Sequence, residues 1–492
     1  MSQPSACSTN PWSDDDKLHE ECAVFAIHGH RQAAALTVLG LHALQHRGQE
    51  ATGIVSFDGE QFNTHRALGL VGDNFSSSEV VEKLHGHAAI GHNRYATSGD
   101  TVLRNVQPLF ADFDCGGFAI GHNGNLTNAR QLRQQLIKDG AIFHSTTDTE
   151  VILHLVAKAK GTSFVQRLVT ALTQIEGAYS LVCIAKDKII GLRDPHGIRP
   201  LVLGKVNDAY VLASETCALD IIGGDYIRDI KPGEMVVVDA DGVHSQFPFT
   251  PKTSRFCIFE YIYFARPDSW LEGRSVYAMR KRIGMELAKE SAVLGADVIV
   301  PVPDSGVPSA LGFAEASGVP FELGIIRNHY VGRTFIEPTD HIRHFGVKLK
   351  HNANRKLLEG KSVVLVDDSI VRGTTSMKIV DMVRQAGAKE VHMRISSPPT
   401  THSCFYGIDT PEQERLLAHR FTVEEMAKHI GVDSLAFISM DGLYRAMGEA
   451  KRDVNAPAFC DACFTGDYPI RLSDKMEASD QEPVTRFMER QV

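Results

Sequence analysis

Residues 363–376 read VVLVDDSIVRGTTS, and this stretch decides the fold of the second half of the chain. An apolar run predicts a buried strand that ends at Asp367 and Asp368, after which a short loop leads into a helix. In open α/β sheets, ligands bind at the carboxyl ends of the strands. N–H groups at a helix start favour a phosphate, and paired carboxylates suit ribose hydroxyl groups or a hydrated magnesium ion. The loop and helix start add one glycine and three hydroxyl groups, at Gly373, Thr374, Thr375 and Ser376.

Taken alone, the dipeptide Asp367-Asp368 is equally compatible with a carboxylate that caps a turn. The whole fourteen-residue pattern favours a ligand site, and the surrounding sequence predicts a parallel sheet. A helix is predicted at 276–291, and the strands that follow it are predicted at 297–303, 321–326, 361–368 and 390–398. Strands that alternate with helices are typical of a parallel α/β sheet.

The first half of the chain has a different pattern of predicted strands and helices. Short apolar or alternating runs between turn residues predict strands at 22–27, 51–57, 87–96, 116–126, 178–185, 188–194, 201–205, 209–215 and 234–239. Helices are predicted at 31–44, 128–138 and 149–158. We therefore predict a polar leader over 1–21, an α+β domain over 22–255, an α/β domain over 256–470 and a polar tail over 471–492.

Composition excludes several classes of protein. The chain has 492 residues with 43% hydrophobic and 23% charged residues, which is ordinary for a globular protein. Its 51 Lys and Arg against 60 Asp and Glu give a net charge of −9, which argues against a nucleic-acid partner. No apolar run reaches the length of a membrane span, and residues 1–21 lack the apolar core of a secretory signal. We expect a cytoplasmic protein with no membrane partner.

Two further segments support the reading of residues 363–376. Residues 301–310, PVPDSGVPSA, follow a predicted strand, and residues 327–338, RNHYVGRTFIEP, form a basic loop. Together the three segments resemble the sites at which type I phosphoribosyltransferases bind 5-phosphoribosyl 1-pyrophosphate (PRPP). The resemblance implies PRPP contacts at Asp304, Ser305, Gly306, Arg327, Arg333, Asp367, Asp368, Arg372, Gly373, Thr374, Thr375 and Ser376. It also implies one magnesium ion per subunit, at Ser305, Asp367 and Asp368.

Four blocks in the first half resemble the N-terminal-nucleophile glutamine amidotransferases, whose fold stacks two antiparallel sheets between helices. The blocks are LQHRGQEATGI (44–54), GHNRYATSG (91–99), GHNGNLTN (121–128) and TTDTE (146–150). The resemblance implies that the leader is removed, so that Cys22 supplies both a nucleophilic thiol and an α-amine. With a pKa of about 7.7–8.0, a free α-amine is a suitable base for that thiol.

The same resemblance assigns roles to the polar residues of these blocks. Asn123 and the N–H of Gly124 are expected to stabilise the oxyanion formed from the glutamine amide. Arg94 is expected to bind the α-carboxylate of glutamine, and Asp148 its α-ammonium group. Taken alone, an Asn-Gly pair is more often a tight turn and an isolated Asp a helix cap.

Four of the nine cysteines are candidate ligands of a metal centre. Cys460 and Cys463 are a Cys-x-x-Cys pair, and Cys257 and Cys404 complete a set of four thiols. Such a set fits tetrahedral zinc or an iron–sulfur cluster equally well, so spacing does not choose between them. The cysteines at 115, 183 and 217 are predicted to be ordinary buried thiols.

The two halves together resemble the amidophosphoribosyltransferases, and specifically the branch with a cleaved leader. That resemblance implies one [4Fe–4S] cluster per subunit on Cys257, Cys404, Cys460 and Cys463. It implies transfer of ammonia from glutamine to PRPP, giving 5-phosphoribosylamine, glutamate and pyrophosphate at the first committed step of purine synthesis. It also implies inhibition by purine nucleotides and a homotetramer.

Two other functions compete with this one. The same glutaminase could serve a different acceptor, as in glucosamine-6-phosphate synthase, but a sugar-isomerase domain has no use for the motif at 363–376. A PRPP-sensing regulator with a degenerate site would need no nucleophile. The intact set of Cys22, Arg94, Asn123, Gly124 and Asp148 disfavours it.

Overall fold

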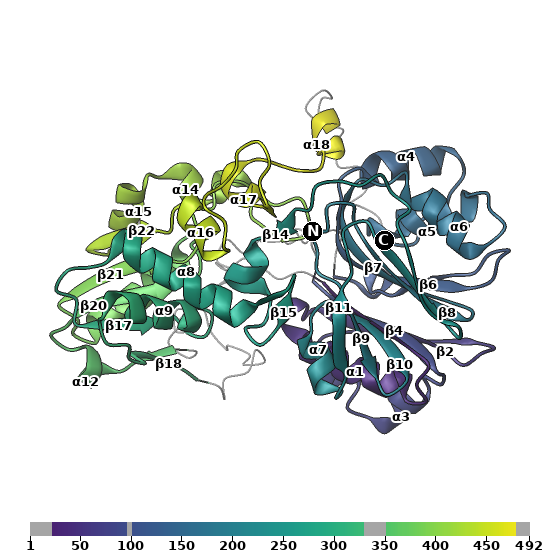
Figure 1. Ribbon diagram of the computed structural model, residues 1–492, viewed down its shortest axis with the longest axis horizontal. Coiled ribbons are helices and arrows are strands. Elements are labelled where there is room, and N and C mark those ends of the chain that lie inside the picture. Colours follow the sequence, from purple (N-terminus) through teal and green to yellow (C-terminus); the bar gives the residue numbers. More distant parts are fainter. Residues whose placement is uncertain (1–21, 96–100, 329–350, 479–492) are drawn as a thin grey trace, which may run out of the picture. The chain divides into compact units, whose positions relative to one another are not determined.

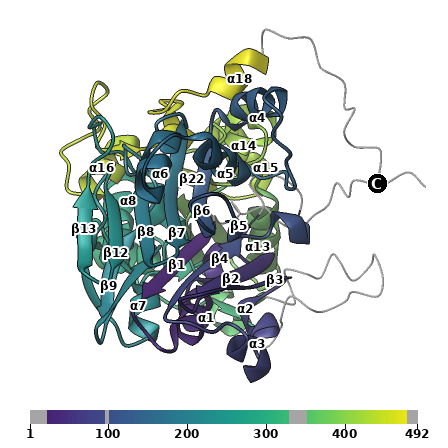
Figure 2. The same ribbon diagram turned by 90° about the vertical axis from the view of Figure 1, so that its right-hand side faces the viewer.

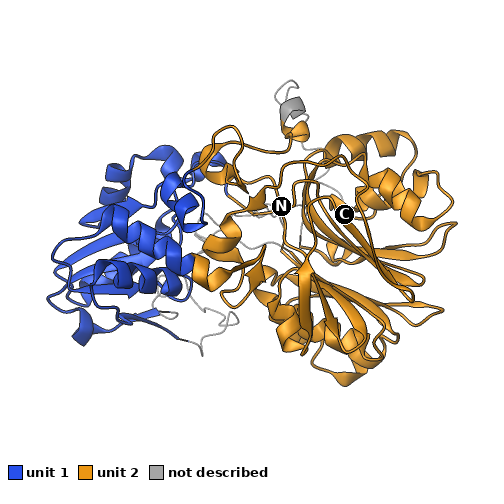
Figure 3. Ribbon diagram, in the orientation of Figure 1, with its two compact units in different colours: residues 1–19, 280–402, 411–451 blue, residues 20–279, 403–410, 452–492 orange. Residues whose placement is uncertain are grey.

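A computed structural model describes residues 22–95, 101–328 and 351–478 of the chain (Figure 1). These residues form two compact units, each assembled from segments that are not contiguous in sequence (Figure 3). Among the described residues, unit 1 lies within 280–402 and 411–451, and unit 2 lies within 22–279, 403–410 and 452–478. The predicted domain limits at 255 and 470 stay a prediction.

Unit 2 is built on two antiparallel sheets. The seven-stranded sheet has the order β11-β9-β10-β1-β4-β2-β3, and the six-stranded sheet has the order β13-β12-β8-β7-β6-β5. The strands of the first are β1 Ala23–His28, β2 Ala51–Phe57, β3 Phe62–Leu68, β4 Ala88–Arg94, β9 Val202–Val206, β10 Ala209–Ala213 and β11 Asp225–Asp229. Those of the second are β5 Leu109–Ala111, β6 Phe118–Leu126, β7 Gly177–Ala185, β8 Lys188–Arg193, β12 Met235–Asp239 and β13 Gly242–Gln246.

Helices cover the outer faces of both sheets. Helices α1 Ala33–Ala43 and α7 Cys217–Ile221 lie on one side, and α4 Ala129–Lys138, α5 Thr149–Lys158 and α6 Phe164–Leu172 lie on the other (Figure 2). Buried side chains from β1, β4, β6, β7 and β12 pack between the sheets, and a second core lies under α5 and α6. Apolar side chains on both faces explain why these strands read as nearly continuous hydrophobic runs. The two stacked antiparallel sheets confirm the α+β prediction.

Unit 1 is built on a parallel sheet with the strand order β17-β20-β21-β22. Its strands are β17 Val298–Pro301, β20 Ser362–Asp367, β21 Glu390–Ile395 and β22 Ser434–Phe437. Val298 lies opposite Val363 and Asp367 opposite Ile395, so the carboxyl ends of β17, β20 and β21 share one edge. Helices α9 Val307–Ser317, α13 Thr374–Gln385 and α15 Val423–Ile430 connect and cover the strands, and α8 Val276–Ser291 precedes them. The predicted parallel sheet is confirmed.

One predicted strand is wrong. Residues 321–326 do not form a strand of the parallel sheet, since only Phe321 makes a single bridge to Ile299. The strand β18 begins later, at Ile325–Arg327, and pairs in antiparallel fashion with β19 His351–Ala353 in a separate two-stranded sheet. Apolar composition cannot distinguish these cases, because a short apolar run carries no information about its pairing partner.

Short elements complete both units. Unit 2 also contains the strand pair β14 Phe256–Cys257 and β23 Phe459–Cys460, the pair β15 Trp270–Leu271 and β16 Arg274–Ser275, and the helices α2 Val71–Asn74, α3 Ser78–Glu82, α17 Ala462–Thr465 and α18 Ser473–Ala478. Unit 1 contains α12 Arg355–Leu358, α14 Leu417–Arg420 and α16 Met440–Ala446. Single helical turns are η1 Gln45–Arg47, η2 Leu103–Asn105, η3 Glu260–Phe264 and η4 Gln413–Arg415. No helix in the described ranges combines the length and the apolar character needed to cross a membrane.

Candidate functional site

Cys22 and Arg94 lie side by side at one end of the seven-stranded sheet. Strand β1 pairs with β4 with Ala23 opposite Asn93, so the register places Cys22 beside Arg94. Cys22 is 6% exposed, and its Sγ donates to the Tyr95 carbonyl oxygen at 3.5 Å. Burial raises the pKa of the Cys22 thiol, against the lowering effects of the Arg94 charge and the Tyr95 contact. The thiol is therefore held in its neutral form and needs a base to become a nucleophile.

The histidines around this thiol are poor bases. His92 lies opposite Val24 in the sheet, and burial lowers its pKa to about 3. His122 precedes Asn123, and burial lowers its pKa as well. Because a base with such a low pKa holds a proton weakly near neutrality, neither imidazole is suited to accept the Cys22 proton. An α-amine created at Cys22 itself would have an ordinary pKa of about 7.7–8.0, which suits a base near neutrality.

Asn123 and Gly124 come from the other sheet, in the middle of β6. Asn123 is fully buried, and within the described residues neither its Nδ2 nor its Oδ1 has a hydrogen-bond partner. A buried amide without partners is costly, and such groups often mark a ligand site. Gly124 has φ +140, and a Cβ there would lie 2.0 Å from the Ala178 carbonyl oxygen of β7, so only glycine fits. The predicted oxyanion donors are thus on a tightly packed strand.

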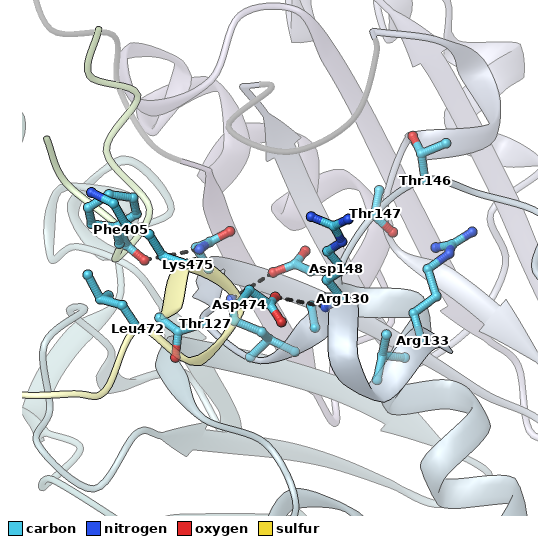
Figure 4. A pocket seen from close by; sticks show the side chains of 14 residues that line it. Thr127, Arg130, Arg133, Thr146, Thr147, Asp148, Phe405, Leu472, Asp474 and Lys475 are labelled. Carbon is cyan, nitrogen blue, oxygen red and sulfur yellow. Dashed lines mark hydrogen bonds between the residues drawn. The ribbon is translucent and has the colours of Figure 1, made fainter. Parts of the chain in front are cut away.

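Asp148 lies immediately before α5 on the wall of a cavity. Its Oδ2 accepts the Leu126 N–H at 2.9 Å, which ties it to the end of β6. The cavity measures about 460 Å³, within the range of ligand pockets, and Figure 4 shows Thr146, Thr147 and Arg130 around Asp148. Cys22, Arg94 and Asn123 do not line this cavity, although the charge of Asp148 acts on Cys22 and raises its pKa.

The PRPP residues predicted around 363–376 gather at the shared strand edge of unit 1. Asp367 ends β20 and Asp368 follows it, and each residue is 2% exposed. The Asp368 N–H donates to Asp367 Oδ1 at 2.9 Å, and Ser369 Oγ donates to Asp368 Oδ1 at 2.7 Å. Two adjacent buried carboxylates repel each other, so a divalent cation bound beside them would relieve that repulsion.

The predicted pyrophosphate loop meets the same edge. Ser305 lies between β17 and α9, and its Oγ donates to Asp368 Oδ2. Asp304 forms an ion pair with Arg327 at the end of β18. The structure therefore brings Asp304, Ser305 and Arg327 together with Asp367 and Asp368. Gly306 follows Ser305 at the start of α9, and Arg372, Gly373, Thr374, Thr375 and Ser376 form the loop and first turn of α13. Arg333 lies outside the described residues.

The four cysteines of the second half gather in unit 2. Cys257 in β14 lies opposite Cys460 in the parallel partner β23, and Cys463 follows in α17. Cys404 Sγ accepts the Tyr406 N–H at 3.3 Å. Burial raises the pKa of Cys257 to about 11, and burial together with the charges of Cys257 and Cys404 holds the pKa of Cys460 well above its usual range.

The fourth thiol behaves in the same way, since burial and the charges of the other three raise the pKa of Cys463. Each thiol thus lies within electrostatic reach of others, and the cysteines are free rather than disulfide-bonded. Outside this set, Cys183 and Cys217 are buried as predicted, but the prediction is wrong for Cys115, which is exposed because it lies in a turn before β6. Among the described residues, no three or more His, Cys, Asp and Glu side chains are grouped as a site for a metal ion.

A buried network of charges in unit 2 was not predicted from the sequence. Arg47 donates to Glu215 and to Glu260, each at 2.5 Å, and Arg199 also forms an ion pair with Glu260. All four side chains are at most 1% exposed, so losing any one would leave an uncompensated buried charge. Arg47 lies just before Glu50, whose N–H donates to the Arg94 carbonyl oxygen at 3.1 Å. Only its position in the matched block 44–54 singled out Arg47, and nothing singled out Glu260.

Comparison with known proteins covers nearly the whole chain. Residues 92–220 match the glutamine amidotransferase domain family, and residues 280–396 match the phosphoribosyl transferase domain family. An amidophosphoribosyltransferase of Rhizobium etli is 58% identical over 96% of this chain and 97% of its own length. A chloroplastic amidophosphoribosyltransferase of Arabidopsis thaliana is 53% identical over 94% of this chain and 81% of its own length.

A solved structure agrees with these matches. The glutamine PRPP amidotransferase of Bacillus subtilis, complexed with ADP and GMP, has a TM-score of 0.87 and 48% sequence identity to this chain. The likeness covers 92% of this chain and 98% of that one.

Proposed function

This chain belongs to the amidophosphoribosyltransferase family, and from that premise we propose that its two units catalyse two coupled reactions. Unit 2 releases ammonia from glutamine, and unit 1 adds that ammonia to C1 of PRPP, forming 5-phosphoribosylamine and pyrophosphate. The product commits the ribose phosphate to purine synthesis. The observation that carries this proposal is that one chain matches both domain families, with the residues of both predicted sites present.

The glutaminase reaction follows from the residues around Cys22. The Cys22 thiol gives its proton to the Cys22 α-amine and attacks the amide carbon of glutamine. Asn123 Nδ2 and the Gly124 N–H donate to the oxyanion, and the unpartnered Asn123 amide supports this role. The α-amine then protonates the leaving nitrogen, and water releases glutamate from the thioester. Losing one oxyanion donor typically costs about 2.7–4 kcal/mol of transition-state stabilisation.

Substrate orientation is assigned to two charged side chains. Arg94, buried beside Cys22, carries a planar guanidinium that binds two carboxylate oxygens at once. Asp148 accepts the α-ammonium group of glutamine, with its position held by the Leu126 N–H. Opposite charges at the two ends of the α-amino-acid group fix which way the side-chain amide points.

The transferase reaction is assigned to the strand edge of unit 1. The loop and helix start at 372–376 bind the 5-phosphate through N–H and hydroxyl groups, and Asp304, Ser305, Gly306, Arg327 and Arg333 bind the pyrophosphate. Asp367, Asp368 and Ser305 would hold one magnesium ion, which supplies charge neutralisation for the departing pyrophosphate. The two buried carboxylates fit that ion.

Two maturation steps belong to the proposal. The bond between Glu21 and Cys22 must be cut, because an acylated nitrogen is not a base. The thiols of Cys257, Cys404, Cys460 and Cys463 would together hold a [4Fe–4S] cluster with a structural role. Four thiols with raised pKa values, three of them buried and Cys404 half-buried, fit a cationic centre, since neighbouring thiolates need positive charge to be stable.

Intact mass and a visible spectrum test both maturation steps. We expect purified protein to have the mass of a chain that begins at Cys22, plus a broad visible absorbance with about four iron and four sulfide per chain. Cys404→Ser should remove the absorbance, whereas Cys115→Ser, which changes an exposed thiol outside the set, should leave it intact. A colourless protein that contains zinc would contradict the cluster, and a mass that begins at Met1 in active enzyme would contradict the leader.

Coupling of the two reactions is tested by glutamate release. We expect the release of glutamate to rise at least about tenfold when PRPP and magnesium are added, because substrate binding at one site shifts the other toward its active state. A matched sample with ribose 5-phosphate in place of PRPP should stay at the basal rate. Equal rates with and without PRPP would indicate a glutaminase that serves another acceptor.

Regulation and assembly extend the proposal. The Bacillus subtilis structure was solved in complex with ADP and GMP, and we infer that purine nucleotides also inhibit this chain. Their phosphate groups would compete for the cradle at 372–376. A homotetramer in the cytoplasm remains our expectation for the assembled enzyme.

A further inference from the structure

Residues 403–410 are a short segment of unit 2 that lies, in sequence, between two stretches of unit 1 (Figure 3). The segment is fastened to other parts of unit 2 at Ser403 and at Tyr406. The Tyr468 hydroxyl donates to the Ser403 carbonyl oxygen at 2.6 Å, and the Tyr406 hydroxyl donates to the Ile470 carbonyl oxygen at 2.6 Å. Within the segment, the Cys404 N–H donates to Thr410 Oγ1 at 2.7 Å. The segment is therefore a rigid support rather than a loose connection.

This segment contacts the strand that carries the oxyanion donors. Asn125 Nδ2, one residue after Gly124 in β6, donates to the Phe405 carbonyl oxygen at 3.0 Å. Phe405 in turn lies beside Lys475, whose Nζ is 4.7 Å from the centre of its ring (Figure 4). Asn125 and Phe405 are 280 positions apart in sequence, so no local sequence pattern predicts their contact.

The closest approach is between two glycines. Gly407 has φ +110, and a Cβ at that position would lie 2.9 Å from the Gly124 Cα and 3.1 Å from its carbonyl carbon. Gly124 is equally restricted on the β7 side, where a Cβ would lie 2.0 Å from the Ala178 carbonyl oxygen. The Gly124 peptide thus has backbone packed against it from Gly407 and from β7. Any side chain at position 407 must move backbone atoms, because no flexible side chain is there to yield.

We propose that Gly407 is a positioning residue for the oxyanion donors, and that residues 403–410 form the support that sets the place of the Gly124 peptide. This inference rests on the proposed function, since it takes Asn123 and Gly124 to be the oxyanion donors. An oxyanion donor acts only when it lies about 2.7–3.1 Å from the developing charge, so a shift of a few tenths of an ångström weakens it. Gly407 touches no reacting atom and acts through Gly124.

The segment also carries Cys404, one of the four thiols assigned to the cluster. The same few residues would then connect cluster ligation with the geometry of the glutaminase site. A loss of activity in a Gly407 variant must therefore be separated from a loss of the cluster, which the visible spectrum and iron content allow.

The test compares Gly407→Ala with Gly59→Ala in the intact enzyme. Gly59, in the turn between β2 and β3, also has φ +110, but a Cβ there would meet nothing within 4 Å. Both variants place an alanine at the same positive φ, and only Gly407→Ala presses on Gly124. We expect Gly407→Ala to lower kcat with glutamine by about 10- to 100-fold while KM for glutamine changes less than about threefold. Ammonia-dependent activity, iron content and visible absorbance should match those of Gly59→Ala.

A second variant keeps the proposal open to refutation if Gly407→Ala does not fold. Asn125→Ala removes the hydrogen bond to Phe405 without adding atoms, and we expect it to lower glutamine-dependent kcat by about three- to tenfold with ammonia-dependent activity intact. If every variant that folds has the ratio of glutamine-dependent to ammonia-dependent rates of the wild type, the support has no role in positioning. Failure of the proposed function is a separate result, because Cys22→Ser would then retain glutamine-dependent activity whatever the Gly407 variant does.

Discussion

Cys22→Ser is expected to lower glutamine-dependent formation of 5-phosphoribosylamine by more than about 10⁴-fold, the scale of loss when a nucleophile is removed from an enzyme. A serine hydroxyl is far less acidic than a thiol, and the burial that raises the pKa of the Cys22 thiol would also disfavour a serine alkoxide, so the α-amine would activate the hydroxyl much less effectively. Ammonia-dependent activity, measured at a pH where ammonia is partly unprotonated, should remain within about twofold of the wild-type rate. The two rates are measured on one preparation by pyrophosphate release.

Cys183→Ala is the matched control for that variant. Cys183 is a buried thiol in the middle of β7, and burial raises its pKa to about 12. It is predicted to be an ordinary core residue, and its loss should leave both activities in place. An equal loss of the glutamine and ammonia activities in Cys22→Ser would contradict two separable sites. Intact mass should accompany the assay, since serine at position 22 also alters the bond at which the leader is removed.

Asp367→Asn and Asp368→Asn should each lower PRPP-dependent amination by about 10²-fold, with glutamine or with ammonia as donor. Each change removes one of two buried negative charges proposed to hold magnesium. A loss of about 2.7 kcal/mol of charge stabilisation in the transition state corresponds to that factor. Basal glutamate release without PRPP should be unchanged, because its residues lie in unit 2. Initial rates are measured as a function of PRPP and of magnesium.

Asp381→Asn is the matched control for these two variants. Asp381 lies on α13, a few turns after the loop, and its carboxylate is exposed and accepts a hydrogen bond from Gln385 at 2.6 Å. The same chemical change at this position should leave both reactions intact. Normal use of PRPP by Asp367→Asn or Asp368→Asn would refute the assignment of the strand edge as the PRPP site.

Local patterns were sufficient wherever a feature depends on neighbours in sequence. The helix at Thr149–Lys158 and the strand at Ala51–Phe57 begin and end where the periodicity predicted. The strand-loop-helix arrangement around Asp367 and Asp368 was also predictable, because an apolar run, two carboxylates and a helix start occupy fourteen consecutive residues. The strand predicted at 321–326 was wrong because the pairing of this apolar run depends on strands elsewhere in the chain, which a local pattern does not reveal.

The site residues were named one by one from matched motifs, but their arrangement was not predictable. That Ser305 donates to Asp368, or that Asp304 pairs with Arg327, depends on which strands are neighbours in the sheet. The burial of Arg47, Arg199, Glu215 and Glu260 was even less predictable from the sequence, because charged residues are usually expected at the surface.

Sequence alone therefore predicted the candidate reactive groups, from matched motifs, together with the two kinds of sheet and the order of the motifs, since side-chain chemistry and periodicity are local properties. Tertiary structure alone decided that residues 403–410 belong with unit 2 and that Gly407 packs on Gly124. Contacts of this kind join positions hundreds of residues apart, and they form because the packed sheets leave only one place for each backbone to lie.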